Sequence, residues 1–283
     1  MTHKRKPEHT VKLNVIQPKS VLNRSGMGGF TLNPYTGCTV GCSYCYVPHM
    51  PHMQAEARTW GAYVDIKQDV PRLLERQLAR LRKPTTVFMS TATDPYQPVE
   101  ERYLITRSIL EVFQRHPQHA LFILTKQSLV ERDAEIIARL PRAAVGMSIS
   151  VMDDNVAQII EPWAPMTSER LATIARLTKR DITTYVLWAP AIVPVPLATE
   201  FVTGSVARVR ESGARALSLD AMNYRSTQPA GLARRLARER HAPATKAQVS
   251  LIEREAERQG LGRRIDILDA QPVEEIEPML PFT

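Results

Sequence analysis

Apolar runs of strand length alternate with segments of helical periodicity along most of this chain. Short runs of apolar and β-branched residues bounded by turn residues predict buried strands, and apolar residues spaced three or four apart predict the helices between them. The predicted strands begin near Phe30 and continue at residues 59–67, 85–94, 120–126, 143–150, 183–190 and 214–220. The predicted helices cover about residues 70–81, 106–114, 129–140, 168–177, 199–212 and 246–259.

This order of elements predicts an α/β fold built on a parallel sheet. Strands that alternate with helices in this way form βαβ units, whose strands lie parallel. Six or so units fit an incomplete barrel better than a short open sheet, so we expect a partial (β/α)6 TIM-like barrel. Residues 29–222 would form this core, between an irregular N-terminal arm at 1–28 and a C-terminal extension at 223–283.

Composition agrees with a folded domain and adds an excess of positive charge. Hydrophobic residues make up 43% and charged residues 23% of the 283 positions, which is ordinary for a globular protein. The net charge of +8 favours a polyanionic partner such as nucleic acid. Arginines gather in GLARRLARERH (231–241) and at Arg263 and Arg264, although solvated helix faces are the simpler explanation for them.

Nothing in the sequence directs the chain to a membrane. Apolar residues never run for the roughly 18 positions that a membrane-spanning helix needs, and the first ten residues lack the apolar core of a signal peptide. We therefore expect a cytoplasmic protein without a membrane partner.

The cysteines of the chain, Cys38, Cys42 and Cys45, all fall within eight residues. Their C-x3-C-x2-C spacing in a cytosolic protein predicts metal binding rather than disulfides, because thiols stay reduced in that compartment. Three thiolates leave one corner of a four-iron cluster open for a small molecule. The alternative is a zinc site completed by His49, in a nucleic-acid-binding module without catalysis.

This spacing, with Tyr44 directly before the last cysteine, resembles the signature of the radical S-adenosylmethionine (SAM) superfamily. The resemblance implies a partial barrel with the cysteine loop after its first strand, a [4Fe-4S] cluster on the three cysteines, and SAM bound at the open iron. It also implies an enzyme that cleaves SAM reductively to a 5′-deoxyadenosyl radical, which abstracts a substrate hydrogen. The electron would come from a donor such as a flavodoxin or ferredoxin. A cluster protein that binds SAM only as a regulator is a further hypothesis.

Several blocks of the chain are similar to the spore photoproduct lyase-like branch of this superfamily, also called DNA repair photolyase-like. They are NPYTGCTVGCSYCY (33–46), STATDPYQPVEERYLITRSIL (90–110), ILTKQSLVERD (123–133), SISV (148–151) and EPWAPMTSERL (161–171). The similarity implies lyase-like chemistry on a nucleic acid, with a peptide or a small metabolite as the alternative substrates. The lyase proper returns a hydrogen atom from a further cysteine near the end of its second barrel strand. Here that stretch offers Met89, Ser90 and Thr91, so no residue is assigned to this step.

The same similarity assigns SAM-binding roles to polar residues at predicted strand ends, where a parallel barrel builds its active site. They are Tyr44 near the adenine, Ser90, Thr91, Thr93 and Asp94 toward the amino group, Lys126, Ser148 and Ser150 toward the carboxylate and ribose, and Arg170. Turn chemistry would equally explain Asp94, solvent exposure Lys126, and backbone capping the serines. Glu161 and Arg170 form either part of the SAM site or a structural ion pair.

Three tyrosines have the chemistry for a further role. Tyr46, Tyr96 and Tyr224 are able to relay a hydrogen atom or to stack on a nucleobase. Ordinary packing is the simpler explanation for each of them.

Overall fold

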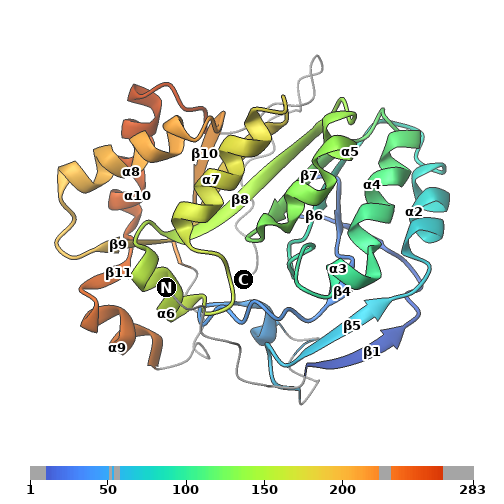
Figure 1. Cartoon of the computed structure of the whole chain (residues 1–283), viewed down its shortest axis with the longest axis horizontal. Coiled ribbons are helices and arrows are strands. Elements are labelled where there is room, and N and C mark those ends of the chain that lie inside the picture. The colour runs from blue at the N-terminus through green and yellow to red at the C-terminus, as the bar shows by residue number, and fades with distance from the viewer. Residues whose placement is uncertain (1–10, 51–52, 54–57, 223–230, 264–283) are drawn as a thin grey trace.

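Six parallel strands form the curved sheet at the centre of the molecule (Figure 1). A computed structural model describes residues 11–50, 53, 58–222 and 231–263. In sheet order the parallel strands are β3 (Phe30–Leu32), β6 (Thr86–Met89), β7 (Ala120–Thr125), β8 (Ala143–Val151), β9 (Thr183–Pro194) and β10 (Ala216–Leu219). Two short strands join them in the antiparallel sense, β2 (Leu22–Arg24) on β3 and β11 (His241–Pro243) on β9.

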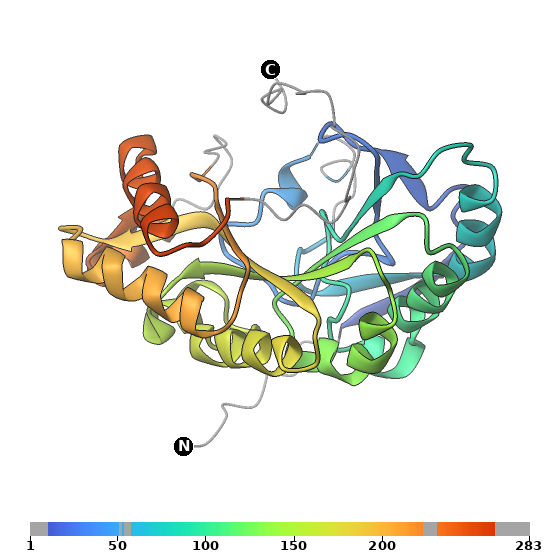
Figure 2. The same cartoon turned by 90° about the horizontal axis from the view of Figure 1, so that it is seen from above.

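Helices cover one face of this sheet and leave the other face open, as Figure 2 shows from above. The covering helices are α2 (Val70–Leu78), α4 (Ile105–Arg115), α5 (Ala134–Ala138), α7 (Thr167–Thr178) and α8 (Thr199–Glu211). Strand residues that face them, such as Val87, Ile123 and Val145, are fully buried. The sheet curves without closing, and this confirms the predicted partial (β/α)6 barrel.

The segment that precedes the barrel contains two strands, β1 and β2, that the sequence pattern did not predict. β1 (Lys12–Ile16) pairs in parallel with β5 (Tyr63–Lys67), and β4 (Tyr35–Thr36) completes a separate three-stranded sheet. The prediction of an irregular segment is therefore wrong for β1 and β2. Both are short strands with mostly exposed side chains, so they lack the apolar run by which a buried strand is recognised.

Several short helices also differ from the expected elements. The helix predicted at 129–140 is a 3-10 helix, η2 (Ser128–Asp133), followed by α5. The elements α3 (Glu100–Tyr103), α6 (Asp154–Ile160) and the 3-10 helix η1 (Val47–His49) were not predicted, because one or two turns carry too little periodicity to detect. Within the described residues, no helix has the length and apolar character to cross a membrane.

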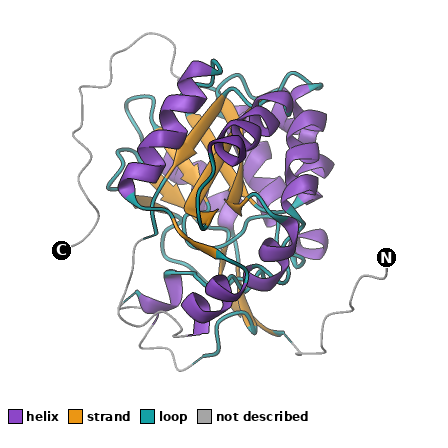
Figure 3. Cartoon of the chain, turned by 90° about the vertical axis from the view of Figure 1, so that its left-hand side faces the viewer, coloured by secondary structure: helices purple, strands orange, loops and turns teal. Residues whose placement is uncertain are grey.

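The C-terminal residues pack against the end of the sheet beyond β9 and β10. They form α9 (Gly231–Arg238), β11 and α10 (Lys246–Arg258), which face the viewer in Figure 3. The predicted helix at 246–259 is confirmed. Thr245 and Gln248 cap its first turn reciprocally, and Ile252 and Ala256 are buried toward α8 and β10.

The inward face of the sheet carries a row of aromatic side chains. The rings of Phe88 and Phe122 stack with centroids 5.5 Å apart, and Tyr185 meets Phe122 edge to face at 6.1 Å. Gly146 pairs with Tyr185 across β8 and β9, and a β-carbon there would lie 2.2 Å from Tyr185 Cζ. The tyrosine ring therefore occupies the space that any other residue at 146 would need.

Candidate active site

The cysteine loop, residues 37–46, leaves the barrel after β3 and runs from β4 to η1. Pairing of β4 with β5 holds its first residues in place. Gly37 begins the loop at a φ of +83°, and a β-carbon there would lie 2.5 Å from the carbonyl oxygen of Tyr63. The close approach and the left-handed backbone both require glycine at this position.

Gln97, which sequence analysis missed, ties the cysteine loop to the segment after β6. Its amide oxygen accepts from the backbone N–H of Thr39 at 3.0 Å, and its amide nitrogen donates to the Gly37 carbonyl at 3.3 Å and to Thr93 Oγ1 at 3.0 Å. Thr93 Oγ1 itself donates to the Gly37 carbonyl at 2.6 Å. Gln97 is completely buried, so these bonds are shielded from competition with water.

The three thiols lie in an environment that disfavours free thiolate. Burial raises the pKa of Cys38 to about 12, with a further contribution from Asp94, and burial raises the pKa of Cys45 to about 11. Burial also holds the pKa of Cys42 well above its usual value. Metal coordination deprotonates such thiols outright, so these side chains suit a metal centre better than free nucleophiles.

The described residues do not bring three Cys, His, Asp or Glu side chains together around a single metal ion. Ligands of one zinc ion must converge in that way. The cysteine ligands of a four-iron cluster each bind a different iron, so they need only surround a common space. The described residues do not form such a convergent set, and both the cluster and the zinc site completed by His49 stay predictions.

A buried carboxylate beside the cysteine loop gathers donors from four elements. Tyr44 and Arg170 both donate to Glu161, Lys126 Nζ lies 2.9 Å from its Oε1, and Ser150 Oγ donates to the same oxygen at 2.9 Å. Lys126 Nζ also donates to Ser148 Oγ at 2.8 Å. We call this group the Glu161 cluster; its members are Tyr44, Lys126, Ser148, Ser150, Glu161 and Arg170.

The Glu161 cluster holds two cationic side chains against one carboxylate. Burial opposes ionisation of Glu161, but Arg170 and Lys126 outweigh it and hold its pKa well below the usual range. Lys126 also lowers the pKa of Cys42 and Cys45, against the larger effect of burial. The surplus positive charge therefore acts on the thiols, where it would stabilise bound anionic groups.

All three nitrogen atoms of the Arg170 guanidinium group donate hydrogen bonds to protein oxygens. Besides Glu161, it donates to the backbone carbonyls of Ser148 at 2.9 Å and Pro165 at 2.8 Å, and its side chain is fully buried. Lys126 keeps a small exposed fraction and lies 5.6 Å above the Tyr44 ring. Of the two cations, Lys126 is the one with access to the mouth of the barrel.

Ser90 has the clearest sign of an unfilled hydrogen-bonding need. It follows β6 with a φ of +73°, and its buried hydroxyl has no partner among the described residues. Buried polar groups are normally paired, so an orphan at a strand end indicates a ligand group that would satisfy it. The residues present therefore fit a polar cofactor at this position.

The other predicted residues after β6 bind protein groups. Asp94 accepts from Thr125 Oγ1 at 2.7 Å and from the backbone N–H groups of Lys126 at 2.8 Å and Tyr96 at 2.9 Å. Burial raises its pKa in spite of these bonds. Asp94 thus joins the ends of β6 and β7, and the Thr91 carbonyl accepts from the Tyr46 hydroxyl at 2.6 Å.

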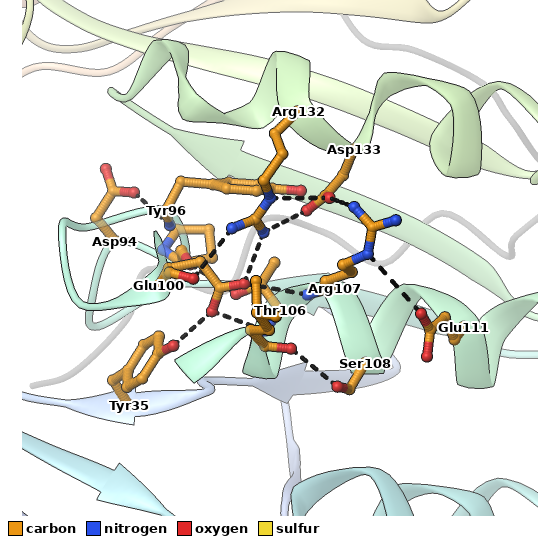
Figure 4. A network of polar contacts seen from close by, with 12 residues as sticks. Tyr35, Asp94, Tyr96, Glu100, Thr106, Arg107, Ser108, Glu111, Arg132 and Asp133 are labelled. Atoms are coloured by element: carbon orange, nitrogen blue, oxygen red, sulfur yellow. Dashed lines mark hydrogen bonds and ion pairs between the residues drawn. The ribbon is translucent and has the colours of Figure 1, made fainter. Parts of the chain in front are cut away.

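A second buried network explains much of the block at residues 90–110. Glu100 is completely buried and accepts from Tyr35, from the Thr106 N–H at 2.9 Å and from Arg132 at 2.8 Å. Figure 4 shows it between Tyr35 and Arg132, with Tyr96 beside the guanidinium group. This network fixes the segment after β6 to β4 and η2, which makes it a support for the site.

Tyr224, the third tyrosine considered for a role in the reaction, lies outside the described residues.

A partial α/β barrel with clustered cysteines and paired charges near the carboxyl ends of its strands has the architecture of an enzyme. The sequence profile of the radical SAM superfamily matches residues 32–190, more than half of the chain. The chain therefore belongs to the radical SAM superfamily.

Its relatives include proteins with and without a known activity. An uncharacterized protein of Methanocaldococcus jannaschii is 28% identical over 196 residues, 69% of this chain and 73% of that protein. A radical SAM Nalpha-GlyT isomerase of Pseudomonas phage M6 is 24% identical over 160 residues, 56% of this chain and 32% of that protein.

Among solved structures, spore photoproduct lyase complexed with dinucleoside spore photoproduct has the same fold. The TM-score is 0.62 at 13% identity, covering 87% of this chain and 78% of that chain. The predicted likeness to this branch is confirmed at the level of the fold.

Proposed function

We propose that this enzyme cleaves SAM reductively at a [4Fe-4S] cluster held by Cys38, Cys42 and Cys45, and that the resulting 5′-deoxyadenosyl radical abstracts a hydrogen atom from a nucleic-acid substrate. The observation that carries the proposal is the set of three thiols, one buried and two partly buried, on one short loop beside the Glu161 cluster. When bound, the cluster supplies the electron for SAM cleavage, delivered by a donor such as a flavodoxin or ferredoxin.

In this proposal the protein binds and orients SAM. Lys126 and Ser148 face the SAM carboxylate, Tyr44 its adenine, and the orphan hydroxyl of Ser90 its amino group, with Thr91 beside it. Ser150, completely buried, donates to Glu161 and so helps to hold that carboxylate. Thr93, Asp94 and Arg170 act as positioning residues, since their polar atoms bind protein groups. They hold the cysteine loop, the end of β7 and Glu161 respectively.

A nucleic-acid substrate has two lines of support. The net charge of +8 favours a polyanion. Spore photoproduct lyase, which shares the fold, has been solved with a dinucleoside photoproduct. Because no cysteine follows β6, the product radical would have to receive its hydrogen atom from another donor than in the lyase.

The test is 5′-deoxyadenosine formation from SAM by anaerobically reconstituted and reduced protein. Wild type should form it, Cys42→Ala should not, and Ser108→Ala, on α4 away from the cysteine loop, should retain the wild-type rate. Bound iron with no 5′-deoxyadenosine would refute the proposal in favour of a SAM-binding regulator. Bound zinc without iron would refute it in favour of a binding module.

A further inference from the structure

α9 lies next to the candidate active site, although it is far from the cysteines along the chain. Leu232 and Leu236 are buried in an apolar cluster that also contains Tyr44. α9 packs against α6, and the last residue of α6, Ile160, accepts a hydrogen bond from the Ser43 N–H at 2.8 Å. One short helix thus separates α9 from the cysteine loop.

The opposite face of α9 carries a cluster of arginines. Burial of Leu232 and Leu236 turns Arg234 and Arg238 outward to solvent, with Arg235 at the boundary. None of these three arginines forms an ion pair with an acidic residue in the described part of the chain. Among the residues that the structure describes, this face therefore presents cationic side chains that no acidic side chain neutralises.

Two other sets of basic side chains differ from those of α9. Arg176 on α7, for example, pairs with Glu131 at 2.8 Å and with Glu169. A second exposed basic group, Arg80, Arg82 and Lys83, precedes β6 and so lies at the opposite end of the barrel from the strand ends that carry the candidate site. The arginines of α9 combine lack of pairing with proximity to the site.

We propose that α9 is a docking element for the phosphodiester backbone of a nucleic-acid strand, with Arg234, Arg235 and Arg238 contacting phosphates. Guanidinium groups bind phosphate oxygens in a bidentate manner, and each such contact releases counterions. This inference rests on the proposed function, because it names the surface by which the substrate of that site is held.

The test measures binding of a fluorescein-labelled 20-nucleotide single-stranded DNA by anisotropy over a range of salt concentrations. The triple variant Arg234→Gln, Arg235→Gln, Arg238→Gln should weaken binding by about 10- to 100-fold at 0.1 M salt and flatten the slope of log K against log salt by about 2. Glutamine keeps the helix propensity, so α9 should remain folded. The matched control, Arg80→Gln, Arg82→Gln, Lys83→Gln, removes the same charge and should change affinity less than threefold.

Three outcomes would overturn the inference: wild type that does not bind the probe, an α9 variant that binds as wild type does, or equal weakening by both triple variants. SAM cleavage without substrate is measured on the same preparations and should be unchanged in both variants. Absence of 5′-deoxyadenosine from wild type is the separate failure of the proposed function. The binding data decide the role of α9 in either case.

Discussion

Glu161→Gln should destabilise the protein far more than neutralising a carboxylate on the surface does. Glu161 and Arg170 are both fully shielded from solvent, and Lys126 and Ser150 use the same carboxylate. The amide keeps the shape but loses the charge, and its NH2 group faces donors. Breaking a buried ion pair by neutralising one partner costs about 3–5 kcal/mol, because the other charge stays buried without compensation.

The measurement is urea unfolding of the metal-free protein under anaerobic conditions, so that cluster loss does not enter the comparison. Glu169→Gln is the matched control: it removes the same charge eight residues further on, where Glu169 and Arg176 are 49% and 44% exposed. Exposed pairs of this kind contribute about 0–1 kcal/mol. The double variant Glu161→Gln, Arg170→Gln should lose less than the sum of the two single variants.

Equal losses for Glu161→Gln and Glu169→Gln would refute this reasoning. Such a result would mean that the charges of the Glu161 cluster are solvated, and that Glu161 does not hold Lys126 and Arg170 in place. Strict additivity of the double variant would have the same meaning, since residues in one network should couple.

Three further predictions follow from the packing of the barrel. Gly146→Ala should lower the free energy of unfolding in urea by about 1–3 kcal/mol, because the new methyl group overlaps the Tyr185 ring. The control Gly204→Ala, where a β-carbon would have no atom within 4 Å, should not destabilise the protein. Equal effects of the two variants would contradict the overlap. Gln97→Leu should lower the iron bound per chain after reconstitution, because the cysteine loop loses its buried amide partner; full iron content would exclude this role. Burial lowers the pKa of His119, so the unfolded chain binds more protons and the free energy of unfolding should fall as pH drops through about 6.5. A flatter plot of unfolding free energy against pH in His119→Gln would verify the assignment. An unchanged plot would disprove it.

The sequence by itself determined the class of fold and the family. Strand and helix patterns are local properties, because a period of two or of 3.6 residues reports which side of an element is buried. The runs that became β7, β8 and β9 were therefore predicted correctly, whereas β1, α6 and α9 were too short or too exposed to show a period. The cysteine spacing is local in the same sense, since three ligands on one loop need no other part of the chain.

Only the tertiary structure decided how the polar residues are used. Glu161 receives Tyr44, Lys126 and Arg170, which come from the cysteine loop, the end of β7 and α7. Sequence left open whether Glu161 and Arg170 form a structural pair, and the structure shows a fully buried one. Gln97 carried no distinguishing pattern, because its function is to satisfy backbone groups of a loop that becomes its neighbour only when the barrel strands pair.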